Sequence, residues 1–138
     1  MTDVTLHLKA AGILLLMLAA VHVFFPKRFC WREELARLST LNRQIFQVHV
    51  LFIVLILVLM GLLSIFYADA LMQPDELARA VLVGLCTFWA LRLVVQWFVY
   101  DRSLWRGQPL NTAVHAVASG LWAYLGTVYG WAAWTTFK

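Results

Sequence analysis

The sequence predicts an all-α integral membrane protein, an up-down bundle of four transmembrane helices with a cytoplasmic amphipathic linker helix between the first two. Of its 138 residues, 63% are hydrophobic and only 13% are charged, whereas a soluble domain carries about 25% charged residues. The mean hydropathy is +0.79. A bilayer crossing needs roughly 20 mostly apolar residues, and four stretches qualify, at residues 6–25, 46–68, 77–100 and 112–134. Little chain is left over, so residues 1–138 are expected to form a single four-helix transmembrane domain.

The second stretch is the clearest of the four. Residues 50–63 (VLFIVLILVLMGLL) carry no charge and are apolar all round, as a lipid-facing helix should be. The first stretch begins with His7 and Lys9, and we expect the lysine to snorkel to the interface. A cleaved signal peptide is the alternative for this stretch, but the Pro-Lys-Arg sequence at 26–28 stands where small residues of a cleavage site are expected.

Lysine and arginine are concentrated in two of the three connections. Seven lie in the connections 26–45 and 101–111, and three lie on the opposite side. The seven are Lys27, Arg28, Arg32, Arg37, Arg43, Arg102 and Arg106, and the three are Lys9, Arg79 and Lys138. The positive-inside rule places both connections in the cytoplasm and both termini on the non-cytoplasmic side, in a bacterial inner membrane or an organellar membrane. The net charge of +4 then requires no nucleic-acid partner, because these residues lie where topology and anionic lipid favour them.

The connections also predict local structure. In the first, apolar residues recur at helical spacing with charged residues between them, which predicts an amphipathic helix in the headgroup plane; the alternative is a linker that only sets topology. In the second, residues 73–76 (QPDE) predict a turn into a helix start, with Pro74 suited to the first helical position and Asp75 and Glu76 complementing the positive end of the helix dipole. In the third, Gly107 and Pro109 mark a turn, and Asn111 or Thr112 is expected to cap the fourth span.

Three of the four histidines are expected at nearly the same depth, near the cytoplasmic face. His22 lies at the end of the first span, His49 near the start of the second, and His115 near the start of the fourth. In an up-down bundle these positions share one side. Polar side chains within a span are costly and tend to face the bundle interior, so the sequence predicts a histidine-lined polar site. His7 lies on the opposite side and is given no role.

The third span carries a polar stripe. Trp89, Arg92, Gln96 and Tyr100 follow one another at spacings of three, four and four, which places them on one face of a helix. Arg92 is expected roughly 12 Å deep at 1.5 Å per residue, where a charge costs at least about 2.5–3.5 kcal/mol. It should therefore have a partner, such as a haem propionate, a lipid phosphate, a quinone carbonyl, a carboxylate or water. The alternative is an arginine that snorkels and bonds backbone carbonyls of a neighbouring helix.

The fourth span has a similar face, which carries His115, Ser119, Trp122, Gly126 and Tyr129. Gly126 and Gly130 form a GxxxG pair, whose small residues let helices approach closely, and we expect this packing to be intramolecular. Trp89 and Trp122 are deep enough to line a ligand pocket.

These residues suggest a cofactor site. Imidazole is a common axial ligand of haem and also suits transition metals. Two histidines on different helices would hold haem b, with its propionates directed toward Arg43 or Arg92, and three histidines with Asp101 or water would hold a transition metal. The candidate cofactor-binding residues are His22, His49, His115, Arg92 and Gln96, and the candidate metal ligands are His22, His49 and His115. Interfacial or packing histidines are the alternative, because the sequence contains no CxxCH, HExxH or paired-cysteine motif.

Two main kinds of function, and a third less favoured one, are compatible with the sequence. The first is a cofactor-binding redox module that passes electrons between haem and quinone. The second is a non-catalytic accessory or assembly subunit of a larger membrane complex, and a small transporter or proton-conducting oligomer is a third. So little chain lies outside the spans that a soluble substrate has no obvious docking place. The expected partners are the lipid bilayer and either other membrane subunits or further copies of the chain.

Overall fold

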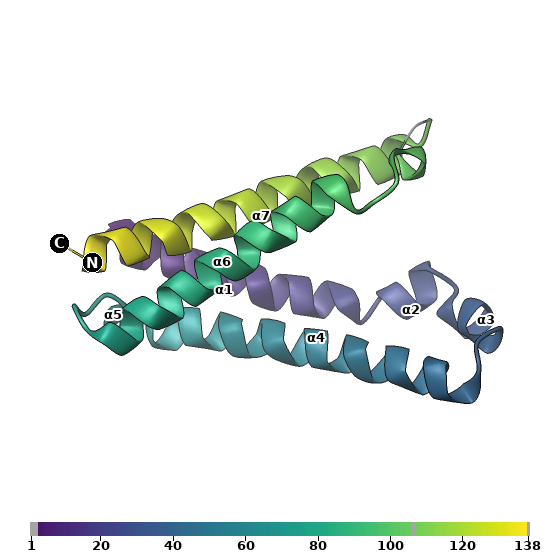
Figure 1. Cartoon of the computed structure of the whole chain (residues 1–138), viewed down its shortest axis with the longest axis horizontal. Coiled ribbons are helices and arrows are strands. Elements are labelled where there is room, and N and C mark those ends of the chain that lie inside the picture. Colours follow the sequence, from purple (N-terminus) through teal and green to yellow (C-terminus); the bar gives the residue numbers. More distant parts are fainter. Residues whose placement is uncertain (1–2, 106, 138) are drawn as a thin grey trace. The chain divides into compact units, whose positions relative to one another are not determined.

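The computed structural model describes residues 3–105 and 107–137, which are mostly helical and contain no strand. The long helices are α1 (Asp3–His22), α4 (Thr40–Phe66), α6 (Glu76–Phe98) and α7 (Pro109–Thr136) (Figure 1). The short ones are α2 (Phe25–Arg28), α3 (Trp31–Ala36), α5 (Ala68–Leu71) and the 3-10 helix η1 (Arg102–Leu104). Arg106 and Lys138, which enter the lysine and arginine count, lie outside the described residues.

Three of the long helices, α1, α4 and α6, are long and apolar enough to cross a membrane. The burial pattern of α4 is also that of a membrane helix. Its buried residues are Leu57, Gly61 and Ser64, whereas Phe52 and Leu59 are 61% and 52% exposed. Small residues gather where membrane helices meet, and large apolar residues face lipid. This pattern agrees with the predicted class of membrane protein. α7 is not one of the three helices that meet the length and hydropathy criteria.

The connection between α1 and α4 differs from the prediction. In place of one amphipathic helix, the chain forms the short helices α2 and α3, which are separated at Cys30. Cys30 has a left-handed backbone with φ of 49°, a conformation that does not continue a right-handed helix. α4 then begins at Thr40, before the predicted start of the span, and Ser39 Oγ accepts from the Asn42 N–H at 3.4 Å.

The start of α6 corrects a second prediction. Asp75 is the N-cap, and its Oδ2 accepts hydrogen bonds from the Leu77 and Ala78 N–H groups at 3.0 and 3.1 Å. Pro74 therefore precedes the helix and does not occupy its first position. A carboxylate at the N-cap satisfies backbone donors that have no partner within the helix.

The start of α7 also differs from the predicted one. Neither Asn111 nor Thr112 is the cap, because the helix already begins at Pro109, with Gln108 as an N-cap that makes no side-chain cap bond. Proline has no N–H to satisfy and its φ suits the first turn of a helix. Thr112 instead donates from Oγ1 to the Trp105 carbonyl at 2.9 Å, which ties the first turn of α7 to the connection before it.

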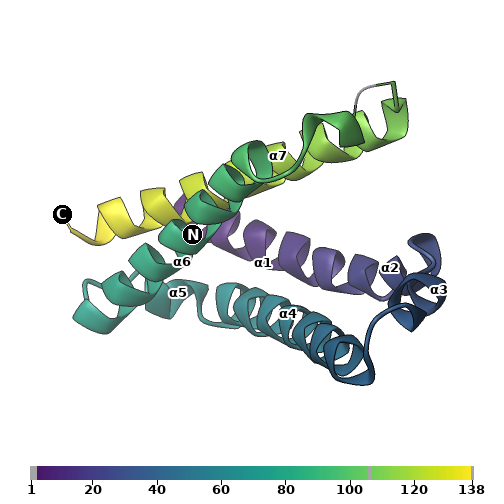
Figure 2. The same ribbon diagram turned by 45° about the vertical axis from the view of Figure 1, so that its right-hand side comes forward.

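The chain divides into two compact units. The α1–α4 unit comprises residues 9–68, and the α6–α7 unit comprises residues 69–138 together with residues 1–8. Figures 1 and 2 show α6 and α7 side by side as an antiparallel hairpin in the second unit, and α1 beside α4 in the first.

Glycine makes the interface between α1 and α4. A Cβ atom on Gly12 would lie 2.7 Å from the Gly61 carbonyl oxygen and 2.7 Å from Ile65 Cγ1, and one on Gly61 would lie 2.9 Å from Leu16 Cδ2. These distances leave no room for a side chain, so the two backbones touch. Because Gly12 meets Ile65 while Leu16 meets Gly61, the helices run antiparallel. Close backbone approach provides van der Waals contact in lipid, where the hydrophobic effect does not drive helices together.

Bulky side chains make the interface between α6 and α7. Trp89 stacks on Trp122 with ring centroids 5.1 Å apart and 14° between the planes, and the two residues are 2% and 6% exposed. They are buried against each other within the interface. A Cβ on Gly126 would meet the Ala90 backbone nitrogen at 3.8 Å and the Trp89 Cβ at 3.9 Å, which are ordinary contacts, and one on Gly130 would meet Cys86 Sγ at 3.1 Å. The GxxxG pair therefore packs within this hairpin, as predicted, but at Gly126 it leaves room for a Cβ, unlike the Gly12–Gly61 crossing.

Candidate functional site

A chain of hydrogen bonds joins three of the predicted site residues in the α6–α7 unit. Arg92 Nη1 donates to Gln96 Oε1 at 3.1 Å, and Gln96 Nε2 lies 2.8 Å from His115 Nδ1. Trp122 Nε1 donates to the same Gln96 oxygen at 3.4 Å. Gln96 is 6% exposed. The four-residue spacing places Arg92 and Gln96 on one face of α6, and His115 and Trp122 reach them from α7.

The Gln96 amide has one orientation that satisfies all three neighbours. Guanidinium and indole N–H groups only donate, so the amide oxygen faces Arg92 and Trp122. The amide nitrogen, which is a donor, then faces His115, and the Nδ1 of that ring must accept. A neutral imidazole carries one N–H. His115 therefore carries its hydrogen on Nε2.

Aromatic rings surround these polar groups. Trp105 stacks on His115 with centroids 4.1 Å apart and 27° between the planes. The Cζ atom of Arg92 lies 4.9 Å from the Trp122 ring centroid and 5.8 Å from that of Tyr100, and ring faces attract a guanidinium. The partner of Arg92 in the structure is thus a glutamine amide with two ring faces. Arg92 and Gln96 lie on one face of α6, whereas Tyr100 lies beyond the end of this helix at Phe98, and its ring approaches Arg92 from the connection that follows.

Arg92 and His115 both have hydrogen-bond donors beyond this chain of bonds. A guanidinium has five N–H donors, and the described residues accept one from Arg92. The Nε2–H of His115 meets no acceptor among the described residues. A hollow of about 490 Å³, lined by residues 97–101, includes the Tyr100 ring that Arg92 approaches. The cluster therefore offers N–H donors and one positive charge to a ligand that accepts hydrogen bonds.

His22 and His49 lie in the α1–α4 unit and have the opposite tautomer. The Nδ1 of His22 lies 2.8 Å from the Leu18 carbonyl oxygen, and that of His49 lies 2.7 Å from the Ile45 carbonyl oxygen. A carbonyl oxygen only accepts, so Nδ1 donates in both rings, and in a neutral imidazole Nε2 then keeps its lone pair. His22 and His49 belong to one unit and His115 to the other, so the convergence of all three histidines stays a prediction.

The structure shows no ready-made site for a bare metal ion among the residues it describes, where no group of three or more His, Cys, Asp or Glu side chains is placed to hold one. Asp101, considered above as a companion ligand, accepts from the Ser103 N–H at 2.7 Å. This backbone bond, and then the Ser103 hydroxyl, hold the pKa of Asp101 below its ordinary value. Its carboxylate caps the short helix η1. Cys30 and Cys86 are free thiols.

The fourth histidine, His7, contacts two aromatic residues of α7, which the sequence did not predict. His7 Nδ1 lies 3.0 Å from the Tyr124 hydroxyl, and its ring centroid lies 5.9 Å from that of Trp131. This contact joins the first turns of α1 to α7 within the α6–α7 unit. The available signal was the seven-residue spacing of Tyr124 and Trp131, which places both on one face of α7.

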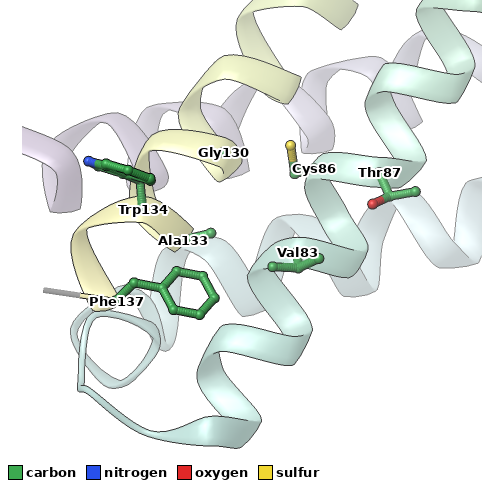
Figure 3. A pocket seen from close by; sticks show the side chains of 7 residues that line it. All are labelled: Val83, Cys86, Thr87, Gly130, Ala133, Trp134 and Phe137. Atoms are coloured by element: carbon green, nitrogen blue, oxygen red, sulfur yellow. The ribbon is translucent and has the colours of Figure 1, made fainter.

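A second cavity, of about 230 Å³, lies between α6 and the end of α7. Figure 3 shows Val83 and Cys86 of α6 on one side, and Gly130 and Phe137 on the other. Its lining carries no charged residue, and its polar side chains are those of Thr87, Cys86 and Trp134. The charged and hydrogen-bonding groups that could recognise a polar ligand are therefore at Arg92, Gln96 and His115.

The fold and this cluster define a helical protein with three helices able to cross a membrane and a donor-rich polar site on its α6–α7 hairpin. No known protein family matches the chain, and no curated protein or solved structure matches it either.

Proposed function

We propose that the chain is a four-helix integral membrane protein that binds a lipid-soluble, hydrogen-bond-accepting ligand of the quinone class, as part of a membrane redox module. The binding residues are Arg92, Gln96 and His115. In this proposal α7, which is 28 residues long, is the fourth crossing and pairs with α6. Both termini lie on the non-cytoplasmic side of a bacterial inner membrane or an organellar membrane.

The orientation of the Gln96 amide carries the proposal. It makes His115 a donor through Nε2–H, in the same cluster as the Arg92 guanidinium. A quinone carbonyl oxygen accepts hydrogen bonds and gains negative charge on reduction, and bonds from charged donors to such an oxygen are the stronger kind. A metal cation fits poorly, because Arg92 repels it and the His115 Nε2 has no free lone pair in this tautomer.

The surroundings also favour an aromatic ligand that arrives through the membrane. An open surface hollow is lined by residues 97–101, which directly follow the segment that carries Arg92 and Gln96. Trp97 and Tyr100 are among its lining residues, and aromatic rings form stacked or edge-on contacts with other rings. The short connections outside the long helices leave little surface for a soluble substrate.

Quenching of tryptophan fluorescence by a short-chain benzoquinone, in protein purified in mild detergent, tests this function. We expect saturable quenching in the unmodified protein. Arg92→Gln should weaken binding about 10- to 100-fold, since a hydrogen bond involving a charged group contributes about 1.5–3 kcal/mol. His115→Phe should weaken it about 2- to 10-fold, since the neutral imidazole contributes about 0.5–1.5 kcal/mol. The phenylalanine preserves a ring against Trp105 and removes the donor.

His7→Phe is the matched control, because it makes the same substitution at the other histidine that contacts α7. It should bind the quinone as the unmodified protein does. Saturable quenching that Arg92→Gln and His115→Phe leave unchanged would overturn this site. An absence of saturable quenching, together with co-purification of a larger membrane complex, would replace the proposal with the accessory-subunit function.

A further inference from the structure

We infer that His22 and His49 are the two axial ligands of a b-type haem held by the α1–α4 unit. This site uses none of the residues of the proposed quinone site, and neither proposal depends on the other. It replaces the predicted cluster of three equivalent histidines with a pair that differs chemically from His115.

The first support is the tautomer. In His22 and His49, Nδ1 donates to a carbonyl of the same helix at 2.8 and 2.7 Å, which leaves the Nε2 lone pair for a metal. Histidines that bind metals commonly donate their other N–H to a carbonyl, which fixes the ring and raises its basicity as a ligand. By the same reasoning His115 is not a ligand, since its Nε2 carries the hydrogen.

The second support is depth. α1 and α4 run antiparallel and touch at Gly12 and Gly61. His22 lies ten residues after Gly12, and His49 lies twelve residues before Gly61. At 1.5 Å per residue these positions are about 15 and 18 Å from the crossing, in the same direction, so their depths differ by about 3 Å, less than one helical turn.

The third support is direction around each helix. With 3.6 residues per turn, His22 is rotated roughly 80° from Gly12 and His49 roughly 120° from Gly61, in the same rotational sense. In an antiparallel pair, equal rotational sense brings both positions to the same side of the interface. His22 is half-buried and His49 is exposed, so this side of the pair is open to a planar ligand.

The number of ligands favours haem over a bare ion. A porphyrin supplies four nitrogens to its iron and needs two from the protein, whereas a bare zinc ion takes three or four protein ligands. Among the described residues, no group of three or more His, Cys, Asp or Glu side chains is placed to hold a bare ion. The Phe25 ring lies 4.5 Å from that of His22 and offers an apolar contact. Lys27, Arg28 and Arg43, at the same end of the unit, supply cations for the propionates.

An absorption spectrum of the full chain, purified in mild detergent and titrated with hemin, tests the inference. We expect about one haem per chain, with a low-spin spectrum whose Soret band shifts and whose α band sharpens on reduction with dithionite. His22→Gly and His49→Gly should each abolish the low-spin spectrum, and added imidazole should restore it by filling the vacated position. His115→Phe is the control and should keep the spectrum.

Added imidazole can restore the low-spin spectrum only if the glycine variant is still folded, so this result distinguishes the loss of a ligand from the loss of the fold. The inference is overturned if the chain binds no haem in this titration. It is also overturned if His22→Gly and His49→Gly keep the low-spin spectrum, or if His115→Phe loses it. Quinone quenching in the two glycine variants should stay as in the unmodified protein, so failure of this site and failure of the quinone site give different results.

Discussion

The two helix pairs of this chain are held together by opposite means. At the α1–α4 interface, Gly12 and Gly61 have no side chains, and the backbones touch. At the α6–α7 interface, Trp89 stacks on Trp122 and Gln96 joins groups from both helices. If both pairs cross the membrane, as proposed, neither gains from hydrophobic burial there, so each would depend on close van der Waals contact or on directed bonds. The interface built from polar side chains is the one that has donors left for a ligand.

The same contrast separates the histidines. His22 and His49 bond the carbonyls of their own helices, so they carry hydrogen on Nδ1. His115 bonds an amide across the interface, so its Nδ1 accepts. The two environments therefore favour different tautomers of one residue type, and the two proposed sites use this difference: one needs a metal ligand and the other a hydrogen-bond donor.

Filling the glycine interface is expected to have the largest effect on stability. Gly12→Ala and Gly61→Ala would each place a Cβ within 3.0 Å of atoms of the opposite helix, at Gly12 a backbone oxygen included, and should lower the free energy of unfolding by about 1–3 kcal/mol. Circular dichroism during thermal unfolding in detergent measures this. Gly84→Ala and Gly120→Ala are the controls, since a Cβ at either position meets nothing within 4 Å. Equal losses in all four variants would show that the close crossing contributes nothing.

A smaller effect is expected at the polar interface. Gln96→Leu removes the acceptor of Arg92 and Trp122 and the donor to His115, and an unsatisfied buried group costs about 1–3 kcal/mol. Ring faces still contact Arg92, so we expect a loss of about 1–2 kcal/mol in the same unfolding measurement. Ser119→Ala, which removes one bond from Trp97, should change stability less. If Gln96→Leu is as stable as the unmodified protein, the amide does not hold the two helices together.

The smallest effect is expected where α7 ends. Arg79 Nε donates to the Thr136 carbonyl at 2.8 Å, and its guanidinium lies 5.3 Å from the Phe137 ring centroid. A cation at a helix C-terminus contributes about 0.3–1 kcal/mol, so Arg79→Ala should speed amide hydrogen exchange in the last turn of α7. Arg79→Lys keeps the charge and should exchange more slowly than the alanine variant. Identical exchange in all three proteins would show that Arg79 does not stabilise this end.

The long helices are predictable from the sequence because each contains a run of apolar residues. The break at Cys30 is not, because a left-handed backbone at a non-glycine residue leaves the apolar spacing unchanged. The start of α4 at Thr40 is also missed, since polar residues there fit a linker as well as a helical extension. Asp75 is the N-cap of α6 although Pro74 also suits a helix start, and the choice depends on bonds that form only in the folded turn.

The candidate site is predictable in part. Helical spacing places Arg92 and Gln96 on one face of a helix, and the predicted membrane depth of His115 adds this residue to the same site. The amide orientation, and with it the tautomer, depends on which residue of α7 faces Gln96, and the periodicity of one helix does not give the register between two. The crossing of Gly12 with Gly61 is missed for the same reason, because each is an isolated glycine in its own helix.

Both proposed sites depend on the inferred position of the histidine hydrogens. Nitrogen-15 NMR of the histidine-labelled protein in micelles measures it directly, at a pH of about 8 or above, where an ordinary imidazole is neutral. Single histidine substitutions assign the signals. We predict hydrogen on Nε2 in His115 and on Nδ1 in His22 and His49. Hydrogen on Nδ1 of His115, or one tautomer shared by all three rings, would contradict the division of this chain into a donor site and a metal-ligand site.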